Sequence, residues 1–217
     1  GAVISTLLIT PCLPLRGIYF AIVTLLFPLI FEKLIQAFNI FGGTNGIMGL
    51  DGFPSSWWET YIAIIATLVV MFALRRLVVE DVGLVLRGVK DNDQSVKASG
   101  ISVTFCKALA VFIASAIGCF AGAFLSHMYM WAGLSLFALD FSIMPIAATV
   151  IGGGGTLVGP LIGSFILVPL SELLRSFGTL RIVVYSLVLT AFIVFKSEGI
   201  MVYAERKYHQ FERWVKV

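Results

Sequence analysis

Long apolar segments are the feature that most constrains the fold of this 217-residue chain. Hydrophobic residues make up 59% of it and charged residues 12%, which is about half the charge of a typical soluble domain. Apolar runs of about 18 or more residues indicate membrane-spanning helices, because that length crosses the hydrocarbon core of a bilayer. A soluble protein with an all-buried core is the weaker alternative. The sequence therefore predicts an all-α integral membrane protein.

We predict a single transmembrane domain over residues 1–217, with helices at about 1–15, 17–38, 57–74, 108–130, 141–151 (short or broken), 160–177 and 182–195. Pro28 should kink or break the second helix, because proline cannot donate the helical hydrogen bond. Gly118 and Gly122 form a GxxxG pair that permits close helix packing. The chain begins with Gly inside an apolar run, so we expect the natural protein to have further N-terminal sequence.

One long polar passage, residues 75–107, separates two of these apolar segments. Asp91 is predicted to cap the N-terminus of a short helix over Asn92–Ser99, with Gln94 three residues later as in a capping box. Gly100 lies where a left-handed C-terminal cap would fall. A helix of about two turns is not stable alone in water, so it must pack on something or be held by a partner. An ordinary solvated loop is the alternative.

Positive charge gathers in two segments. Of the 15 Lys and Arg residues, six lie in 75–107 and five in the tail 196–217, so the positive-inside rule places both in the cytoplasm. Arg16 then lies on the cytoplasmic side, and the loop at 42–56, rich in Gly, Asn and Pro, lies outside. Two later arginines would also lie outside, against the rule. A broken or re-entrant helix near 152–159 changes the number of membrane crossings so that the tail again lies in the cytoplasm.

Four consecutive glycines begin at Gly152, and such a run is a poor membrane helix. Irregular backbone at membrane depth is tolerated only inside protein or beside a water-filled path, and transporters use broken helices in this way. For the ridge of Gly155, Gly159 and Gly163 we favour close helix packing. For Gly152 to Gly154 we favour a pathway role. The candidate pathway residues are Tyr19, Thr24, Asn45, Gly152, Gly153, Gly154 and Thr156.

For two of these candidates, taken singly, a structural role is favoured over a role in the pathway. Tyr19 fits an interfacial position, and Thr24 can bond its own helix backbone. No GxxxxGK[ST], HExxH or GxSxG pattern occurs in the sequence, so we predict no enzyme activity and no bound metal or cofactor. The three cysteines show no CxxC spacing and are interpreted as packing residues. A net charge of +3 does not indicate a nucleic-acid surface.

Several stretches resemble the permease subunit of ABC importers for branched-chain amino acids, of the LivM type. They are LRGIYFAIVTLLF (Leu15–Phe27), GGTNGIMGL (Gly42–Leu50), RGVKDNDQSVKASGISV (Arg87–Val103) and IGGGGTLVGPLIG (Ile151–Gly163). VFKSEGI (Val194–Ile200) resembles the closing motif of that family, FRPQG, with Ser-Glu in place of Pro-Gln. Ser95 and Val96 stand where the family commonly has small alanines.

The resemblance implies a type II importer fold in a bacterial inner (plasma) membrane, with several passes through it. The short helix would dock into a cleft of an ATP-binding subunit and act as a coupling helix. Candidate coupling residues are Arg87, Lys90, Asp91, Asp93, Gln94, Lys97 and Gly100. The implied partners are a LivH-like second permease, two ATP-binding subunits that hold ATP and Mg, an extracytoplasmic solute-binding protein and membrane lipid.

The implied function is ATP-driven alternating access for branched-chain or other hydrophobic amino acids. Permeases for urea, short amides and related organic solutes belong to the same family and are an alternative. An ion-coupled secondary transporter is less favoured, because it needs a buried acidic residue and the predicted spans nearly lack one. A structural or scaffold membrane protein is the remaining alternative.

Overall fold

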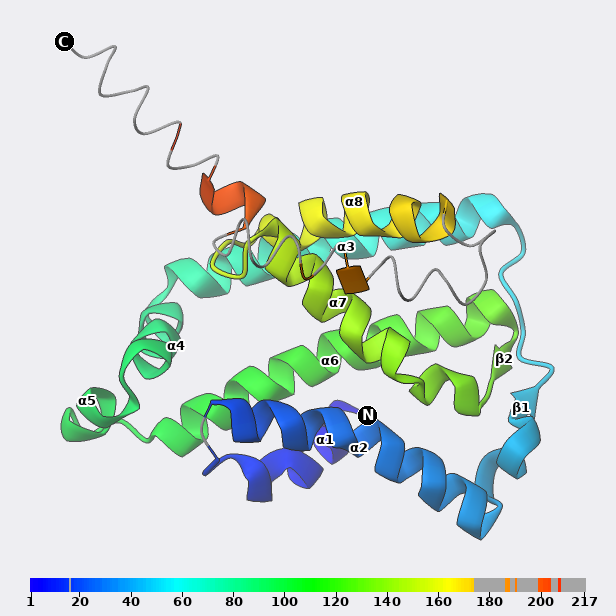
Figure 1. Ribbon diagram of the computed structural model, residues 1–217, viewed down its shortest axis with the longest axis horizontal. Helices are drawn as coiled ribbons and strands as arrows, with labels where there is room; N and C mark the ends of the chain where they lie inside the picture. The colour runs from blue at the N-terminus through cyan, green and yellow to red at the C-terminus, as the bar shows by residue number, and fades with distance from the viewer. Residues whose placement is uncertain (16, 174–185, 188–189, 191–198, 204–206, 208–217) are drawn as a thin grey trace. The chain divides into compact units, whose positions relative to one another are not determined.

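The computed structural model describes residues 1–15, 17–173, 186–187, 190, 199–203 and 207 (Figure 1). Two compact units divide the chain, the first over Gly1–Leu139 and the second over Asp140–Val217. The described elements are helical apart from one short two-stranded ladder. The last predicted helix, 182–195, lies almost wholly outside the described residues, as does most of the predicted tail, 196–217.

The first unit contains most of the described elements. They are α1 (Ala2–Ile9), the 3-10 helix η1 (Thr10–Cys12), α2 (Ile18–Phe38), η2 (Ile40–Asn45), β1 (Ile47–Met48), α3 (Ser56–Val79), α4 (Asp81–Asp91), α5 (Asp93–Ala98), α6 (Val103–Tyr129), β2 (Trp131–Ala132) and η3 (Leu134–Phe137). Helix α7 (Leu139–Gly152) begins at the boundary between the units, and α8 (Gly159–Leu173) follows it in the second unit.

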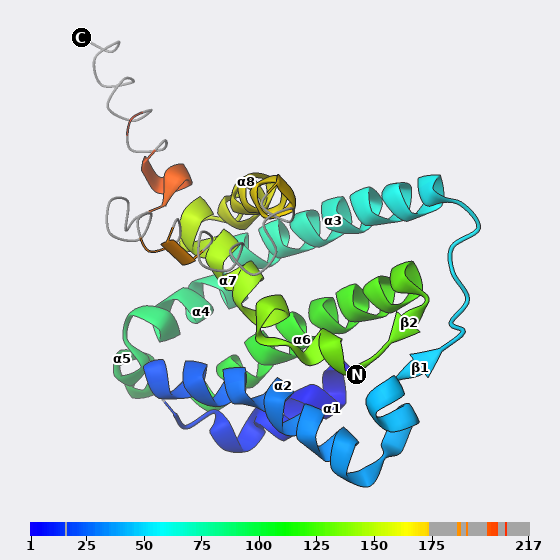
Figure 2. The same cartoon turned by 45° about the vertical axis from the view of Figure 1, so that its right-hand side comes forward.

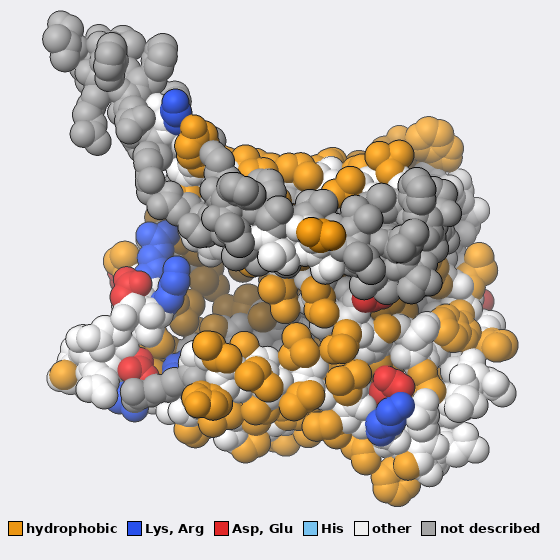
Figure 3. All heavy atoms as spheres, viewed as in Figure 1, with side chains coloured by type: hydrophobic (Ala, Val, Ile, Leu, Met, Phe, Trp, Pro, Cys, Tyr) orange, Lys and Arg blue, Asp and Glu red, His pale blue; other side chains and the backbone are white. Residues whose placement is uncertain are grey.

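Among the residues that the structure describes, four helical stretches are long and apolar enough to cross a membrane, namely Ile18–Phe38, Ser56–Val79, Val103–Tyr129 and Leu134–Gly152. Large hydrophobic side chains remain exposed along the first three, and Figure 3 shows apolar side chains covering α1 and α2. Exposed apolar area is unfavourable in water, at roughly 25 cal/mol per Å². Lipid or partner helices are the environment that such surfaces require, and the all-α membrane fold predicted from composition is confirmed.

Two helices are longer than the sequence predicted. The apolar piece at 141–151 was expected to be too short to cross a bilayer, but η3 and α7 together form a stretch of 19 residues, Leu134–Gly152. Helix α3 was expected to stop at the Arg75–Arg76 pair and instead continues to Val79. Arginine is a good helix former. The Nε of Arg76 also pairs with Glu80 at 3.0 Å across one turn.

Pro28 lies inside α2, which is continuous from Ile18 to Phe38. Of the two predicted effects of Pro28, the break is therefore wrong, and the kink stays a prediction. Membrane helices tolerate proline, because neighbouring groups can satisfy the backbone carbonyl that it leaves without a donor. Gly118 and Gly122, the predicted packing pair on α6, face open space in this chain, with no described atom within 4 Å of the side-chain position.

The first unit has two distinct ends. Helices α4 and α5 connect α3 to α6 at one end, and the β1–β2 ladder lies at the other (Figures 1 and 2). Gly17, just before α2, lines a groove with α4 and α5, so the start of α2 lies at the α5 end. The passage at 75–107 and the loop at 42–56 thus lie at opposite ends of the unit. The predicted topology requires this separation.

The loop at 42–56 was expected to lack regular structure and is instead fastened to the end of α6. Ile47 pairs with Ala132 and Met48 with Trp131 in an antiparallel ladder. The indole Nε1 of Trp131 donates to the carbonyl of Asn45 at 3.0 Å. The ring Nδ1 of His127 lies 2.8 Å from the carbonyl of Asp51. A two-residue ladder leaves no periodic pattern in a sequence, which is why it was missed.

Candidate functional sites

Helix α5 is capped at its N-terminus by Asn92 rather than by Asp91. The Asn92 Oδ1 accepts hydrogen bonds from the amides of Gln94 and Ser95, at 3.0 and 3.3 Å. Asp91 is the last residue of α4, so its predicted role as the cap is wrong. Asn and Asp are nearly equal as N-caps, and the sequence Asp-Asn-Asp places several candidates side by side. Because α4 includes Asp91, the next residue, Asn92, is the one that caps α5.

The C-terminus of α5 ends in a Schellman motif, which confirms the predicted left-handed conformation of Gly100. Gly100 has a φ of +83° and donates its amide to the carbonyl of Lys97 at 3.0 Å. The amide of Ile101 reaches back to the carbonyl of Val96 at 3.4 Å. These are the two bonds that define the motif. Both ends of this six-residue helix are therefore closed by local hydrogen bonds.

Helix α5 also packs on its neighbours, which a helix of this length needs in order to be stable. A Cβ at Gly88 of α4 would lie 3.2 Å from Val96 Cγ2, so glycine at 88 leaves room for the larger side chain at 96. The Asp93 carboxylate lies 3.9 Å from the Lys107 ammonium of α6, and both side chains are partly buried. Asp93 and Val96 thus face inward. The helix is attached to both α4 and α6.

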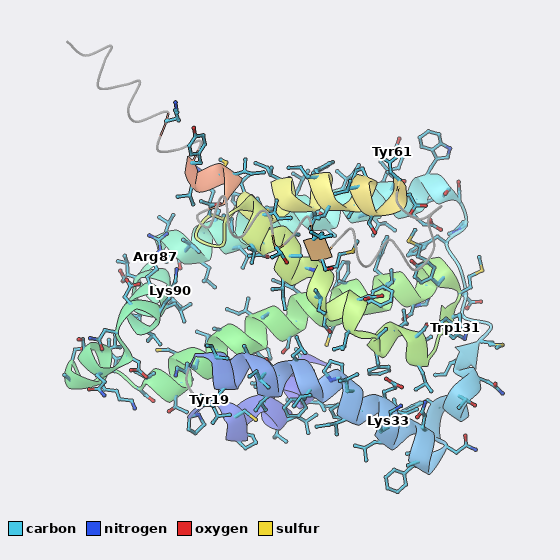
Figure 4. The ribbon with its side chains drawn as sticks, viewed as in Figure 1. Tyr19, Lys33, Tyr61, Arg87, Lys90 and Trp131 are labelled. Atoms are coloured by element: carbon cyan, nitrogen blue, oxygen red, sulfur yellow. The ribbon has the colours of Figure 1, made fainter. Side chains whose placement is uncertain are left out.

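The remaining predicted coupling residues are exposed at this end of the unit. They are Arg87, Lys90, Asp91, Gln94, Lys97 and Gly100. Figure 3 shows charged side chains gathered over α4 and α5, and Figure 4 shows Arg87 and Lys90 on α4. A groove of about 720 Å³ runs beneath them, lined by Gly17, Leu86, Val89, Lys90, Asp91, Asn92, Asp93, Gln94, Lys107 and Ala110. Its walls are mixed polar and apolar, as protein-docking surfaces are.

We expect Asn92→Ala to loosen α5 without disturbing α4. Loss of an N-cap costs about 1 kcal/mol, so the Gln94 and Ser95 amides should exchange with solvent about fivefold faster. Hydrogen exchange measured by mass spectrometry or NMR in detergent micelles would show the change. Asp91→Ala is the matched control, because Asp91 makes no cap hydrogen bond, and it should leave those amides unchanged. Equal acceleration in both variants would contradict the cap assignment.

The predicted pathway residues do not form one cluster. Tyr19, near the start of α2, is 73% exposed (Figure 4). The Thr24 hydroxyl donates to its own helix, at 3.0 Å from the carbonyls of Phe20 and Ala21. Asn45 lies beyond the other end of α2, roughly 30 Å from its start at 1.5 Å per residue. The backbone carbonyl of Asn45 accepts the hydrogen bond from Trp131 described above. The Thr24 hydrogen bonds thus match the structural role predicted for that residue.

The glycine-rich stretch forms a turn between α7 and α8, which are separate helices as the predicted break requires. Gly153 has a φ of +116°, a conformation that glycine adopts most easily. The Thr156 hydroxyl donates to the Gly153 carbonyl at 3.1 Å and accepts from the Gly159 amide at 3.1 Å. Thr156 therefore ties both sides of the turn together.

Some of these glycines are crowded by backbone and others are open. A Cβ at Gly152 would collide with the Gly159 carbonyl, and one at Gly163 would collide with the Ala148 carbonyl. Gly152, Gly159 and Gly163 thus allow the close approach of α7 and α8. Gly154 meets only an ordinary contact, 3.7 Å to Thr149 Cγ2, and Gly155 meets nothing within 4 Å. Among the glycines from Gly152 to Gly163, Gly154 and Gly155 are the exposed ones, so Gly155 does not belong to the packed ridge.

These features define a multi-pass α-helical membrane protein with a capped helix held at one end of its membrane helices. The chain belongs to the family described as "Branched-chain amino acid transport system / permease component", whose sequence profile matches residues 1–196. This membership, with the four apolar helices, confirms the predicted multi-pass placement in the inner (plasma) membrane.

Curated relatives include high-affinity branched-chain amino acid transport system permease proteins LivM. The one from Salmonella typhimurium LT2 is 25% identical over 88% of this chain and 52% of its own length. The one from Escherichia coli K12 is 24% identical over the same shares. A probable LivM from Methanocaldococcus jannaschii is 29% identical over 75% of this chain and 50% of its own. The chain thus spans about half the length of the relatives it matches. No solved structure matches it significantly.

Proposed function

We propose that this chain is a transmembrane permease subunit of an ABC importer for branched-chain or other hydrophobic amino acids. Membership of the permease family supports the transport role. The observation that carries the coupling role is α5: a short helix capped at both ends, fastened to two neighbours, with polar side chains facing outward. Urea, short amides and related organic solutes are the alternative cargo.

The proposed assembly contains a LivH-like second permease, two ATP-binding subunits that carry ATP and Mg, and an extracytoplasmic solute-binding protein. Each ATP-binding subunit would grip an exposed α5 face that includes Gln94 and Lys97. Their closure would move α5 as a rigid body, and its attachment to α4 and α6 would pass that movement into the membrane helices. The chain itself would transmit this movement and provide the path for the solute. Hydrolysis of ATP belongs to the partner subunits.

The exposed charges suggest what the gripping surface looks like. Within the described part of the chain, Arg87, Lys90 and Lys97 are exposed and form no ion pair, whereas the inward-facing Asp93 pairs with Lys107. The outward face therefore carries more positive than negative charge. Exposed charges of this kind mainly affect the rate of association and its salt dependence. A partner surface that includes carboxylates would suit it.

Reconstitution in proteoliposomes tests the proposal. With the second permease, the ATP-binding subunits and the binding protein present, leucine uptake should require ATP and Mg on the side that exposes α5. Uptake should stop when the ATP-binding subunits are omitted. Leucine accumulation by the permease alone, driven by a proton or sodium gradient, would instead establish the ion-coupled secondary transporter. Replacing leucine with urea or a short amide distinguishes the alternative cargo.

A further inference from the structure

Gly199, in the closing motif at Val194–Ile200, lies directly on the glycine turn of the second unit. It is buried and has a φ of +83°. A Cβ at this position would lie 2.6 Å from the Gly153 amide nitrogen and 3.2 Å from the Gly152 carbonyl carbon, and closer still to the Gly153 Cα. These neighbours are backbone atoms, which cannot move aside as a flexible side chain would. Only glycine fits both the conformation and the space.

The residues that follow Gly199 anchor it. Ile200 packs against the buried core of this unit, formed by Ala147, Ala148, Ile151 and Leu167. The Tyr203 amide donates to the Gly199 carbonyl at 3.3 Å, so a helical turn begins at Gly199. The last two residues of the closing motif are therefore in contact with the second unit, Ile200 through its side chain in the core and Gly199 through the turn between α7 and α8.

The turn needs an external constraint, because its own residues supply few. Glycine loses more backbone freedom on folding than any other residue, and four occur in succession here. Within the turn, the Thr156 hydroxyl bridges its two sides. Gly154 and Gly155 are exposed and meet no close contact. Gly199 covers the adjoining Gly152–Gly153 backbone, the part with φ at +116°.

We propose that Gly199 and Ile200 form a latch that positions the α7–α8 turn. Gly199 acts through the Gly152–Gly153 backbone, and Ile200 holds Gly199 in place. Displacement of the latch frees the turn, so the segment after Gly199 can control the shape of the break between the two helices. The consequence for transport rests on the proposed function, because the turn shapes a solute path only if this chain is a permease.

Thiol labelling of the turn tests the latch without requiring transport. In a full chain with Cys12, Cys106 and Cys119 replaced by alanine, Leu157→Cys supplies a reporter at a half-buried position of the turn. Adding Gly199→Ala should raise its labelling rate by a water-soluble maleimide several-fold. Met48→Cys is the control reporter, since Met48 is 71% exposed in the first unit. Its labelling rate should stay unchanged.

An unchanged rate at Leu157→Cys, with Met48→Cys also unchanged, would overturn the latch. If Gly199→Ala alters both reporters through misfolding, the milder Ile200→Val is the deciding variant. It retains Gly199 and removes one methylene from the core contact. It should still raise labelling at the turn, by less, and no increase would overturn the proposal.

Transport assays of the same variants distinguish the latch itself from its proposed effect on the solute path. If the turn lines the solute path, Gly199→Ala should change the apparent KM for solute, whereas a purely structural role would lower only the amount of active transporter. Faster labelling with an unchanged KM would leave the latch standing and remove the turn from the path. ATP-independent uptake would contradict the proposed function without affecting the labelling result.

Discussion

Replacing α5 (Asp93–Ala98) with a Gly–Ser linker of equal length is expected to abolish ATP-driven import while leaving membrane insertion intact. The linker keeps the chain connected but removes the rigid element and the Asp93–Lys107 pair that join the coupling end to α6. A flexible linker cannot transmit a displacement. Insertion depends on the apolar helices, none of which is changed. Import into vesicles and protease protection of the inserted chain measure the two effects separately.

Asp81→Ala is the control for the linker variant. It alters an exposed residue at the start of α4, outside the candidate coupling residues, and leaves both caps of α5 in place. Most of the import activity should survive in this control. Full import by the linker variant would show that α5 is a passive loop. Loss of insertion in the linker variant would show instead that the passage at 75–107 is needed for folding.

Gly163→Ala should destabilise the second unit far more than Gly155→Ala. A Cβ at Gly163 would collide with the Ala148 carbonyl and lie 3.0 Å from the Gly152 amide nitrogen, so α7 and α8 would have to separate. Overpacking of this kind costs about 1–3 kcal/mol. Gly155 faces open space without a positive φ, and alanine there changes stability by less than about 1 kcal/mol in either direction.

Thermal unfolding in detergent, followed by the exposure of buried residues, compares the two glycine variants. The Tm should fall for Gly163→Ala and stay near the wild-type value for Gly155→Ala. Equal Tm values would contradict the observed crossing of α7 and α8. A lower Tm for Gly155→Ala alone would indicate that the turn is packed by groups absent from this chain.

The fold class could be predicted from the sequence because it depends on the length of apolar runs. The positions of the apolar helices α2, α3 and α6 along the chain follow directly from that length. Helix ends were less certain. The extension of α3 through Arg75 and Arg76 is accompanied by a local Arg76–Glu80 pair, which apolar periodicity does not reveal. The ladder between Ile47 and Ala132 joins residues far apart in the chain and leaves no local signal.

The candidate sites show the same division between local and non-local causes. The left-handed conformation of Gly100 could be predicted because it depends only on neighbouring residues, with glycine directly after a short helix. Asp93 faces inward near Lys107, which lies on another helix, and the adjacent sequence does not reveal that contact. Which glycines are crowded depends on the crossing of α7 and α8 in space. A run of identical residues therefore could not distinguish Gly152 from Gly155.

Site-specific cross-linking tests the central claim, that α5 is where the ATP-binding subunit engages. A photoreactive amino acid at Lys97, on the exposed face of α5, is compared with one at Met48, at the opposite end of the same unit. In membranes that contain the assembled transporter, cross-links to the ATP-binding subunit should form from position 97 and not from position 48. Cross-links from position 48, or none from position 97 in an assembled complex, would contradict the account.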